Sequence, residues 1–431
     1  MKTQSITKPL LRFLSGSIIA GLTASVPSVQ AEDAFWTALT GGKPDFSVRY
    51  RYENVDDDLQ PREANASTAR FTLGYKTGTF HGFGFYGQVE NVTEIFSGDY
   101  NHPARPQPGV ATVVDPAGTE IEQAYLFLDS TALGLGNNEV RIGRQEITYR
   151  KAPFHRFIGT ILWRQNWQTF DAASVVNTAL PDTKLSYAYV WNVNRIFGDD
   201  APNPLNDFDS NSHFLNAQYT GFPNLNLEAY AYLLEFDNAE QFSTNTYGIR
   251  ANGGIPIDET VKAIYTAEYA HQNDAGDNAN NISADYFLGE LGAKFKFSGP
   301  VNSLLLKASY ELLGGDGGAD RFVTILGTNH AFQGWDDRFL ITPGNGIEDI
   351  YFTAVVKALG AKFVAVYHDL NSDKNSYDYG SEIDLLATRT FNKHYTLGIK
   401  YSDYNADQNA FNTGAIAADV SKFWVFAQLK F

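Results

Sequence analysis

The sequence has 431 residues, and 33 Lys and Arg against 49 Asp and Glu give it a formal net charge of −16. A nucleic-acid-binding surface is not expected with that balance. The chain contains no Cys, so a secreted protein of this length needs a source of stability other than disulfides, and a closed β-sheet is one solution.

The first 31 residues have the organisation of a secretory signal peptide. Three basic residues come first, a mostly apolar segment follows, and Val29-Gln30-Ala31 fits the small-x-small pattern that signal peptidase cleaves. The apolar segment is too short, and too often interrupted by Ser and Gly, to span a bilayer as a helix. We therefore expect a cleaved signal peptide at residues 1–31 and a single domain at residues 32–431.

The composition of the remaining chain favours a membrane β-barrel. Aromatic residues make up 14% of the sequence, with 24 Tyr, 31 Phe and 6 Trp. Membrane barrels place such residues on the outer wall and in two interfacial girdles. No segment after Ala31 approaches the roughly 18 consecutive apolar residues of a transmembrane helix, whereas a barrel strand needs only about 9–11 residues.

Apolar and polar residues alternate with a period of two in segment after segment. In residues 46–53, Phe46 and Tyr50 share one face, while Arg49, Arg51 and Glu53 share the other. The same alternation recurs in residues 69–76, 185–191, 261–269 and 395–401. The polar faces are charged and rich in Gly, which is typical of a water-filled interior.

The connections between these segments also alternate, between short and long. Short turns near Gly78–Gly82 and Gly299-Pro300, for example, follow longer polar segments near 54–67 and 271–284. Barrels in the outer membrane have short periplasmic turns and long extracellular loops. The sequence therefore predicts an all-β transmembrane antiparallel barrel of about 18 strands, an even number that leaves both ends in the periplasm.

The C-terminal segment carries a pattern typical of barrels. It ends on an aromatic residue and its apolar residues alternate, resembling the signal that the outer-membrane assembly machinery recognises: Phe423, Val425, Ala427, Leu429 and Phe431. We expect this machinery, together with outer-membrane lipids and lipopolysaccharide, to be a partner of the chain.

Motifs for catalysis are not evident. The eight His residues are scattered, and neither a metal-binding His or Cys pattern nor a nucleophile elbow occurs. We therefore expect a channel rather than an enzyme, with no catalytic residue, no metal site and no cofactor. Acidic loops leave open the binding of Ca²⁺, although no ligand spacing identifies a site.

Basic residues concentrate on the polar faces of the first third of the chain. These residues are expected to face the lumen, because an Arg on the lipid face near the midplane costs about 2–4 kcal/mol. They are Arg49, Arg51, Arg70, Lys76, either Arg141 or Arg144, and Arg164. Guanidinium groups bind carboxylates bidentately, so an anion-selective pathway is one interpretation. A mutually neutralised lumen that only keeps the pore wet is the other.

Two segments resemble a known family. Residues 141–172 contain Gly143-Arg144-Gln145 and Asn166-Trp167-Gln168-Thr169-Phe170-Asp171, and residues 328–349 contain a second motif with Arg338. Together they resemble the alginate-export family of outer-membrane barrels, and the resemblance covers most of the chain after the signal peptide.

The resemblance implies a monomeric barrel of eighteen strands that passes a polyuronate. It implies that Arg144 and Arg164 bind carboxylates in the lumen and that Asp171 positions them, with Arg338 in the longest loop. Trp167 stands where many relatives have a basic residue. It could stack on a sugar ring in the pore wall, but we expect it to be a girdle residue. The predicted function is passage of alginate-like anionic carbohydrate or small anionic solutes, and the alternative is a general, weakly selective porin or a nutrient-uptake barrel.

Overall fold

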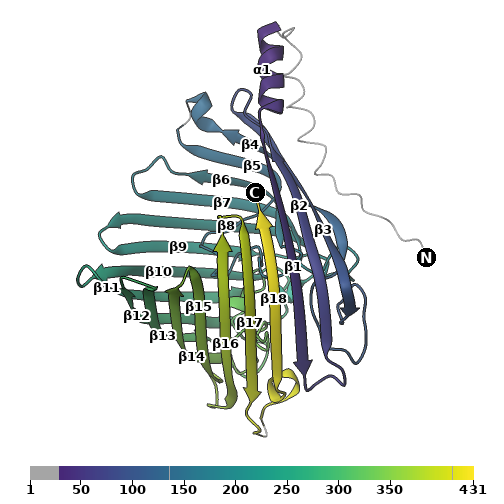
Figure 1. Cartoon of the computed structure of the whole chain (residues 1–431), viewed down its shortest axis with the longest axis vertical. Helices are drawn as coiled ribbons and strands as arrows, with labels where there is room; N and C mark the ends of the chain where they lie inside the picture. The colour runs from purple at the N-terminus through teal and green to yellow at the C-terminus, as the bar shows by residue number, and fades with distance from the viewer. Residues whose placement is uncertain (1–28, 135, 410) are drawn as a thin grey trace.

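The computed structural model describes residues 29–134, 136–409 and 411–431. Most of the predicted signal peptide, residues 1–28, lies outside the described residues. The described part of the chain begins with the helix α1, Val29–Thr40, which was not predicted. The helix ends at Thr40, and Gly41 and Gly42 connect it to the first strand (Figure 1).

Eighteen antiparallel strands form one sheet, as predicted. They are β1 Lys43–Asp57, β2 Ala64–Lys76, β3 Phe83–Asp99, β4 Gly118–Asp129, β5 Asn138–Gln145, β6 Thr169–Asn177, β7 Thr183–Asn194, β8 Asp207–Phe222, β9 Leu225–Leu234, β10 Thr244–Pro256, β11 Val261–Asp274, β12 Ser283–Lys296, β13 Val301–Leu313, β14 Ile347–Ala358, β15 Ala361–Asn371, β16 Asp378–Phe391, β17 Tyr395–Ala406 and β18 Val420–Lys430. Short 3₁₀ helices occur in the connections: η3 Ser130–Leu133, η4 Glu240–Phe242, η5 Asn329–Ala331 and η6 Gly414–Ala417.

The sheet closes because the last strand pairs with the first. Each strand pairs with its neighbours in the chain, and β18 also pairs with β1, with Tyr50 opposite Ala427 (Figure 1). The backbones of Phe46 and Phe431 exchange two hydrogen bonds, of 2.9 and 3.2 Å, at the end of this seam. Closure leaves no exposed strand edge, so every strand is paired on both sides.

The two faces of the sheet differ as the alternation predicts. Outward side chains such as Leu73 and Leu291 are 63% and 71% exposed, whereas inward Arg51 and Glu53 are 1% exposed. Apolar residues thus cover the outer wall and polar ones face the interior. Among the described residues, no helix is long and apolar enough to cross a membrane.

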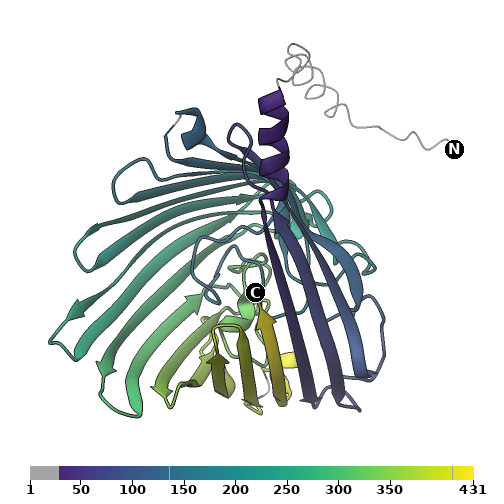
Figure 2. The same ribbon diagram turned by 45° about the horizontal axis from the view of Figure 1, so that its top comes forward.

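Three long connections fold into the barrel. They are residues 100–117, 146–168 and 314–346, which we call the inward loops, and Figure 2 shows loop segments inside the ring of strands. An apolar core forms where they meet the wall, with the ring of Phe157 5.3 Å from that of Tyr286 and 5.9 Å from that of Phe322. Long polar connections were expected from the sequence, and the structure shows that these three turn inward.

Candidate functional site

Two arginines of β1 hold a turn of the second inward loop. Arg49 donates from Nε to Gln165 at 2.8 Å and from Nη1 to the carbonyl of Leu162 at 2.7 Å. Its third donor contacts the carbonyl of Arg164, and Arg51 contacts that of Trp163. The planar guanidinium group suits this task because it presents several donors in a fixed arrangement. Both arginines are therefore clamps that fix the loop to the wall.

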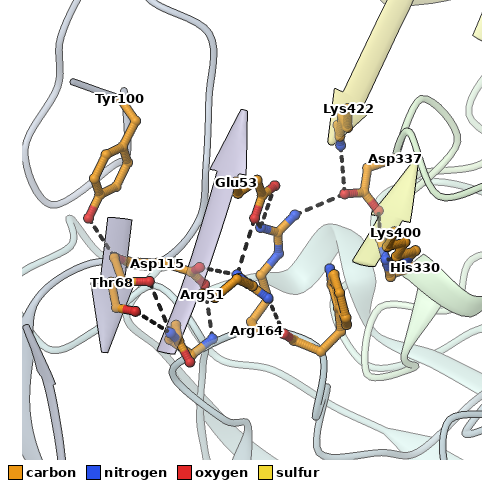
Figure 3. Close-up of polar contacts among 12 residues, drawn as sticks. Arg51, Glu53, Thr68, Tyr100, Asp115, Arg164, His330, Asp337, Lys400 and Lys422 are labelled. Atoms are coloured by element: carbon orange, nitrogen blue, oxygen red, sulfur yellow. Dashed lines mark hydrogen bonds and ion pairs between the residues drawn. The ribbon is translucent and has the colours of Figure 1, made fainter. Parts of the chain in front are cut away.

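Arg51 also joins the first inward loop to this cluster. It forms ion pairs with Asp115 and, at 3.2 Å, with Glu53 (Figure 3). Asp115 in turn accepts a hydrogen bond from the backbone amide of Gln165 at 2.9 Å. The side chains of Arg51, Glu53 and Asp115 are all at most 1% exposed. A buried charge is tolerated only when it is paired, and here each one is.

Arg164 links the second loop to the third. Its guanidinium group lies 3.3 Å from Glu53 of β1 and 2.9 Å from Asp337 of the third loop (Figure 3). Lys422 of β18 reaches the same carboxylate of Asp337 at 2.9 Å. We call the set Arg51, Glu53, Asp115, Arg164, His330, Asp337, Lys400 and Lys422 the ion-pair junction.

His330 and Lys400 complete the junction. His330 lies 2.7 Å from Asp337 through Nδ1, and its Nε2 is 2.5 Å from the ammonium group of Lys400. Three Trp rings surround that ammonium group, with centroids at 4.2, 3.8 and 4.7 Å: Trp163, Trp335 and Trp424. Desolvated cation–π contacts of this kind are worth about 2 kcal/mol or more. Two of the rings belong to inward loops, so Lys400 holds both loops to β17.

The charges of the loop residues follow from this packing. Burial alone would raise the pKa of Asp337, but His330, Lys422 and Arg164 hold it well below its ordinary value. Burial lowers the pKa of His330 to about 3, so its ring is neutral near pH 7. Neutral His330 can donate to Asp337 and accept from Lys400, which fits both contacts. The junction is thus an ordered network of buried charges.

Arg70 is also paired, by a different partner. It forms an ion pair with Glu90 of β3, and its guanidinium carbon lies 3.5 Å from the ring centroid of Trp167. The expectation that Trp167 is a girdle residue is therefore wrong. The ring stacks on a lumenal cation, because the loop that carries it folds inward.

Arg144 and Asp171 pair with each other, as the resemblance implied, but not in the lumen. They are register partners and form a bidentate contact of 2.9 and 3.3 Å. Arg144 alternates with inward Gln145 and shares its strand face with Ile142, which is 55% exposed on the outer wall. The pair therefore lies on the outer face of the barrel, and Asp171 does not contact Arg164.

Arg338 anchors the third inward loop. It makes a bidentate contact with Asp57 at the end of β1, at 2.8 and 3.1 Å, and donates to the carbonyl of Asp419. The structure thus brings Arg49, Arg51 and Arg164 together, with Arg70 directly opposite Arg49 on β2. Arg338 lies apart from them with Asp57, and the Arg144–Asp171 pair lies on the other face of the sheet. Whether any of these residues binds a solute stays a prediction.

Sequence reasoning did not identify the acidic and aromatic partners of the junction. Glu53 was on the predicted polar face, but nothing in the sequence connects it with Asp115, Asp337 or Lys400. Among the described residues, no group of three His, Asp or Glu is arranged to hold a metal ion. Binding of Ca²⁺ by the acidic loops stays untested.

No family model matches the sequence, and no curated protein matches it either. Solved structures do match, over most of both chains. OccAB2 of Acinetobacter baumannii has a TM-score of 0.68 and 15% identity, covering 92% of this chain and 99% of its own. OccD3 (OpdP) of Pseudomonas aeruginosa has a TM-score of 0.63 and 15% identity, covering 91% and 92%. OpdK of the same organism, solved with vanillate, has a TM-score of 0.64 and 15% identity, covering 91% and 99%.

The chain has the fold of an outer-membrane porin. This porin fold agrees with the predicted location in the outer membrane. The predicted membership of the alginate-export family is wrong, because the structures that match are Occ and Opd channels. The Arg-containing motifs that suggested it place charges in and on a barrel wall, which barrels of different families share.

Proposed function

We propose that this porin is a passive channel for the uptake of small solutes across the outer membrane. The observation that carries the proposal is the ion-pair junction, which fixes the inward loops inside the lumen. The single side chain of Arg164 contacts both Glu53 of the barrel wall and Asp337 of the third inward loop. With their side chains at most 8% exposed, these groups lack the water that would replace a lost partner.

Fixed loops favour small solutes over polymers. Removing one partner of a buried ion pair costs about 3–5 kcal/mol, so several such pairs resist displacement of the loops by a passing chain. A second anchor adds to this on the opposite wall, where Arg150 lies 3.1 Å from Glu228 and 2.5 Å from Glu268. The lumen is thus narrowed from two sides by one loop.

The comparison with OpdK supports the expected size of the solute. That structure contains vanillate, a small aromatic carboxylate. For this chain, we carry over a solute of similar size. The arginines of the sequence suggested a preference for anions. Because Arg49 and Arg51 are already bound to the second inward loop, other cationic groups would have to provide that preference. The alternative function, a general porin, would require the loops to leave a wide passage.

Size selection can be measured directly. The refolded protein is placed in liposomes, and swelling is followed with a monosaccharide, a disaccharide and longer oligosaccharides of the same sugar. We expect rapid entry of the smallest solute and a steep fall for the longer ones. Similar entry rates for all would indicate a general porin, and the absence of any entry, with no current in planar bilayers, would contradict a transport function.

A further inference from the structure

Five lysines form a patch on the lumenal side of four strands. They lie near the strand ends that are joined by short turns, which we assign to the periplasm. They occupy β11, β12, β14 and β15, and we call them the lysine row: Lys262, Lys294, Lys296, Lys357 and Lys362. None of these lysines takes part in the ion-pair junction.

The strand register places these lysines opposite one another. Lys262 is paired with Lys294 across β11 and β12, and Lys357 is paired with Lys362 across β14 and β15. Lys296 and Lys357 both face Ser303, on either side of β13. The row thus continues over neighbouring strands with Ser303 between its two halves.

The alternation of each strand points the lysines inward. Lys262 shares its face with Glu268, which is 2% exposed and binds Arg150 of an inward loop. Lys362 shares its face with buried His368, while the adjacent Phe363 is exposed on the outer wall. The same parity holds for Lys357, whose face includes buried Asp349.

None of the five ammonium groups has a carboxylate partner among the described residues. All five side chains are exposed. The neighbouring basic residues on the same wall do have acidic partners: Arg250 lies 3.2 Å from Glu268, and Lys307 pairs with Glu290. Asp258, in the turn before Lys262, accepts hydrogen bonds from the backbone amides of Thr260 and Val261 instead.

Like charges that face one another across two strands destabilise a sheet. Two such pairs on one lumenal face, with no acidic residue to neutralise them, therefore need a compensating role. We propose that the lysine row is a binding site for divalent oxyanions, either a dicarboxylate or a phosphate, at the periplasmic end of the channel. The proposal rests on the channel function proposed above and names the charge class of its solute.

The spacing of the pairs favours a divalent ligand. Side chains directly opposite across strands have Cβ atoms about 4.5–5.5 Å apart, so two flexible Lys side chains can converge on one anion. A divalent anion relieves the repulsion of both ammonium groups, whereas a monovalent anion relieves it only in part. Rings or rows of charged side chains set ion selectivity in channels in this way.

The experiment uses the full barrel in planar bilayers. Single-channel current in potassium chloride is recorded, and inorganic phosphate, sulfate or succinate is then added at increasing concentration. The variant Lys357→Gln/Lys362→Gln removes one pair, and Lys374→Gln/Lys393→Gln removes two exposed lysines from loops outside the row. Lys357→Arg/Lys362→Arg keeps the charge, so it tests whether charge alone suffices. Heat-modifiable mobility on gels verifies that each variant is folded.

We expect phosphate and sulfate to block the wild-type current and the control variant equally. The Gln pair should weaken the block by on the order of tenfold, since it removes two of the charges that attract the anion. Phosphate should block more strongly in alkaline than in mildly acidic buffer, because it becomes divalent, while sulfate should change little. Succinate that blocks as phosphate does would identify charge as the shared feature, and block by only one of the two would identify the source.

Two results would overturn the site. One is equal block of wild type and the Gln pair, and the other is equal block by chloride-matched monovalent acetate. Chloride current that persists in either case would leave the channel function intact. The absence of any current in the wild type would instead contradict the channel function itself.

Discussion

Single arginines decide how the lumen of this protein is filled. Arg164 contacts Glu53 and Asp337, which belong to the wall and to a second loop. Its side chain is 8% exposed, so its charge depends on these carboxylates rather than on water. The residue therefore stabilises a loop arrangement, and its effect is best measured on the loops.

Replacing Arg164 with Ala should free the loops at this point. Leaving Glu53 and Asp337 without this partner should cost about 3–5 kcal/mol of docking free energy, as for other buried pairs. Hydrogen–deuterium exchange of the amides of residues 146–168 should then become faster. In Arg62→Ala, whose ion pair with Asp99 is 56% and 51% exposed, the change should be below about 1 kcal/mol. Unchanged exchange in Arg164→Ala would contradict the clamp.

His330 should make the docking of the third loop depend on pH. Burial lowers its pKa to about 3, from an ordinary value of 6.5. An undocked loop takes up a proton below about pH 6.5 while the docked loop does not, so docking is complete above this range and weakens as the pH falls toward 3. Exchange of the amides of residues 314–346 should rise over that range. His330→Gln should flatten the dependence, and His394→Gln, in an exposed turn, should leave it unchanged.

At the scale of elements, the inward loops behave as parts of the interior. Residues 146–168 connect two hydrogen-bonded strands, for which a turn of a few residues would suffice. The additional length supplies Phe157 to an apolar core and Arg150 to two wall carboxylates. The loop is therefore a constriction that is folded against the wall.

Replacing residues 148–166 with a short Gly-Ser linker should widen the channel. The strands of the barrel keep their own hydrogen bonds, so the variant should still assemble. Single-channel conductance should increase several-fold, and oligosaccharides that the wild type excludes should enter liposomes. Shortening the exposed loop 275–281 between β11 and β12 serves as the control and should alter neither quantity. An unchanged conductance in the first variant would mean that the passage lies elsewhere.

At the scale of the whole molecule, stability comes from closure. The sequence has no Cys, so no disulfide stabilises the barrel. The hydrogen bonds between β1 and β18 instead join the first and last of its eighteen strands. Its backbone hydrogen bonds include Phe431 itself, while the ring of Phe431 is 58% exposed and stacks on His394 at 4.5 Å.

A variant of Phe431 can distinguish the stability of the folded barrel from its assembly into the outer membrane. Phe431→Ala keeps the backbone hydrogen bonds and removes only an exposed ring, so refolding in detergent should be nearly unaffected. If the C-terminal pattern is the assembly signal, the same variant should reach the outer membrane of cells in much smaller amounts. Phe411→Ala, in a loop where the ring is 62% exposed, should assemble normally. Normal assembly of Phe431→Ala would contradict the signal.

The sequence determined the wall of the barrel. Alternation in segments such as 46–53, together with short and long connections, predicted the strands, their number and the outer-membrane location, because a strand has only two faces and each meets a different solvent. The predicted faces of Arg49 and Arg51 followed from the same rule. For Arg144, the same rule gives the outer face that it shares with Ile142, and the lumenal position implied by the family resemblance is wrong.

Only the tertiary structure decided what fills the lumen. Arg51 pairs with Asp115, and Arg164 pairs with Asp337 at a separation of 173 residues. No local pattern encodes such contacts. The pairing of Lys357 with Lys362 is similar, because opposition across strands depends on register. Local periodicity reports the solvent that each face meets, whereas the partners of a buried charge depend on how the closed sheet and its loops are packed.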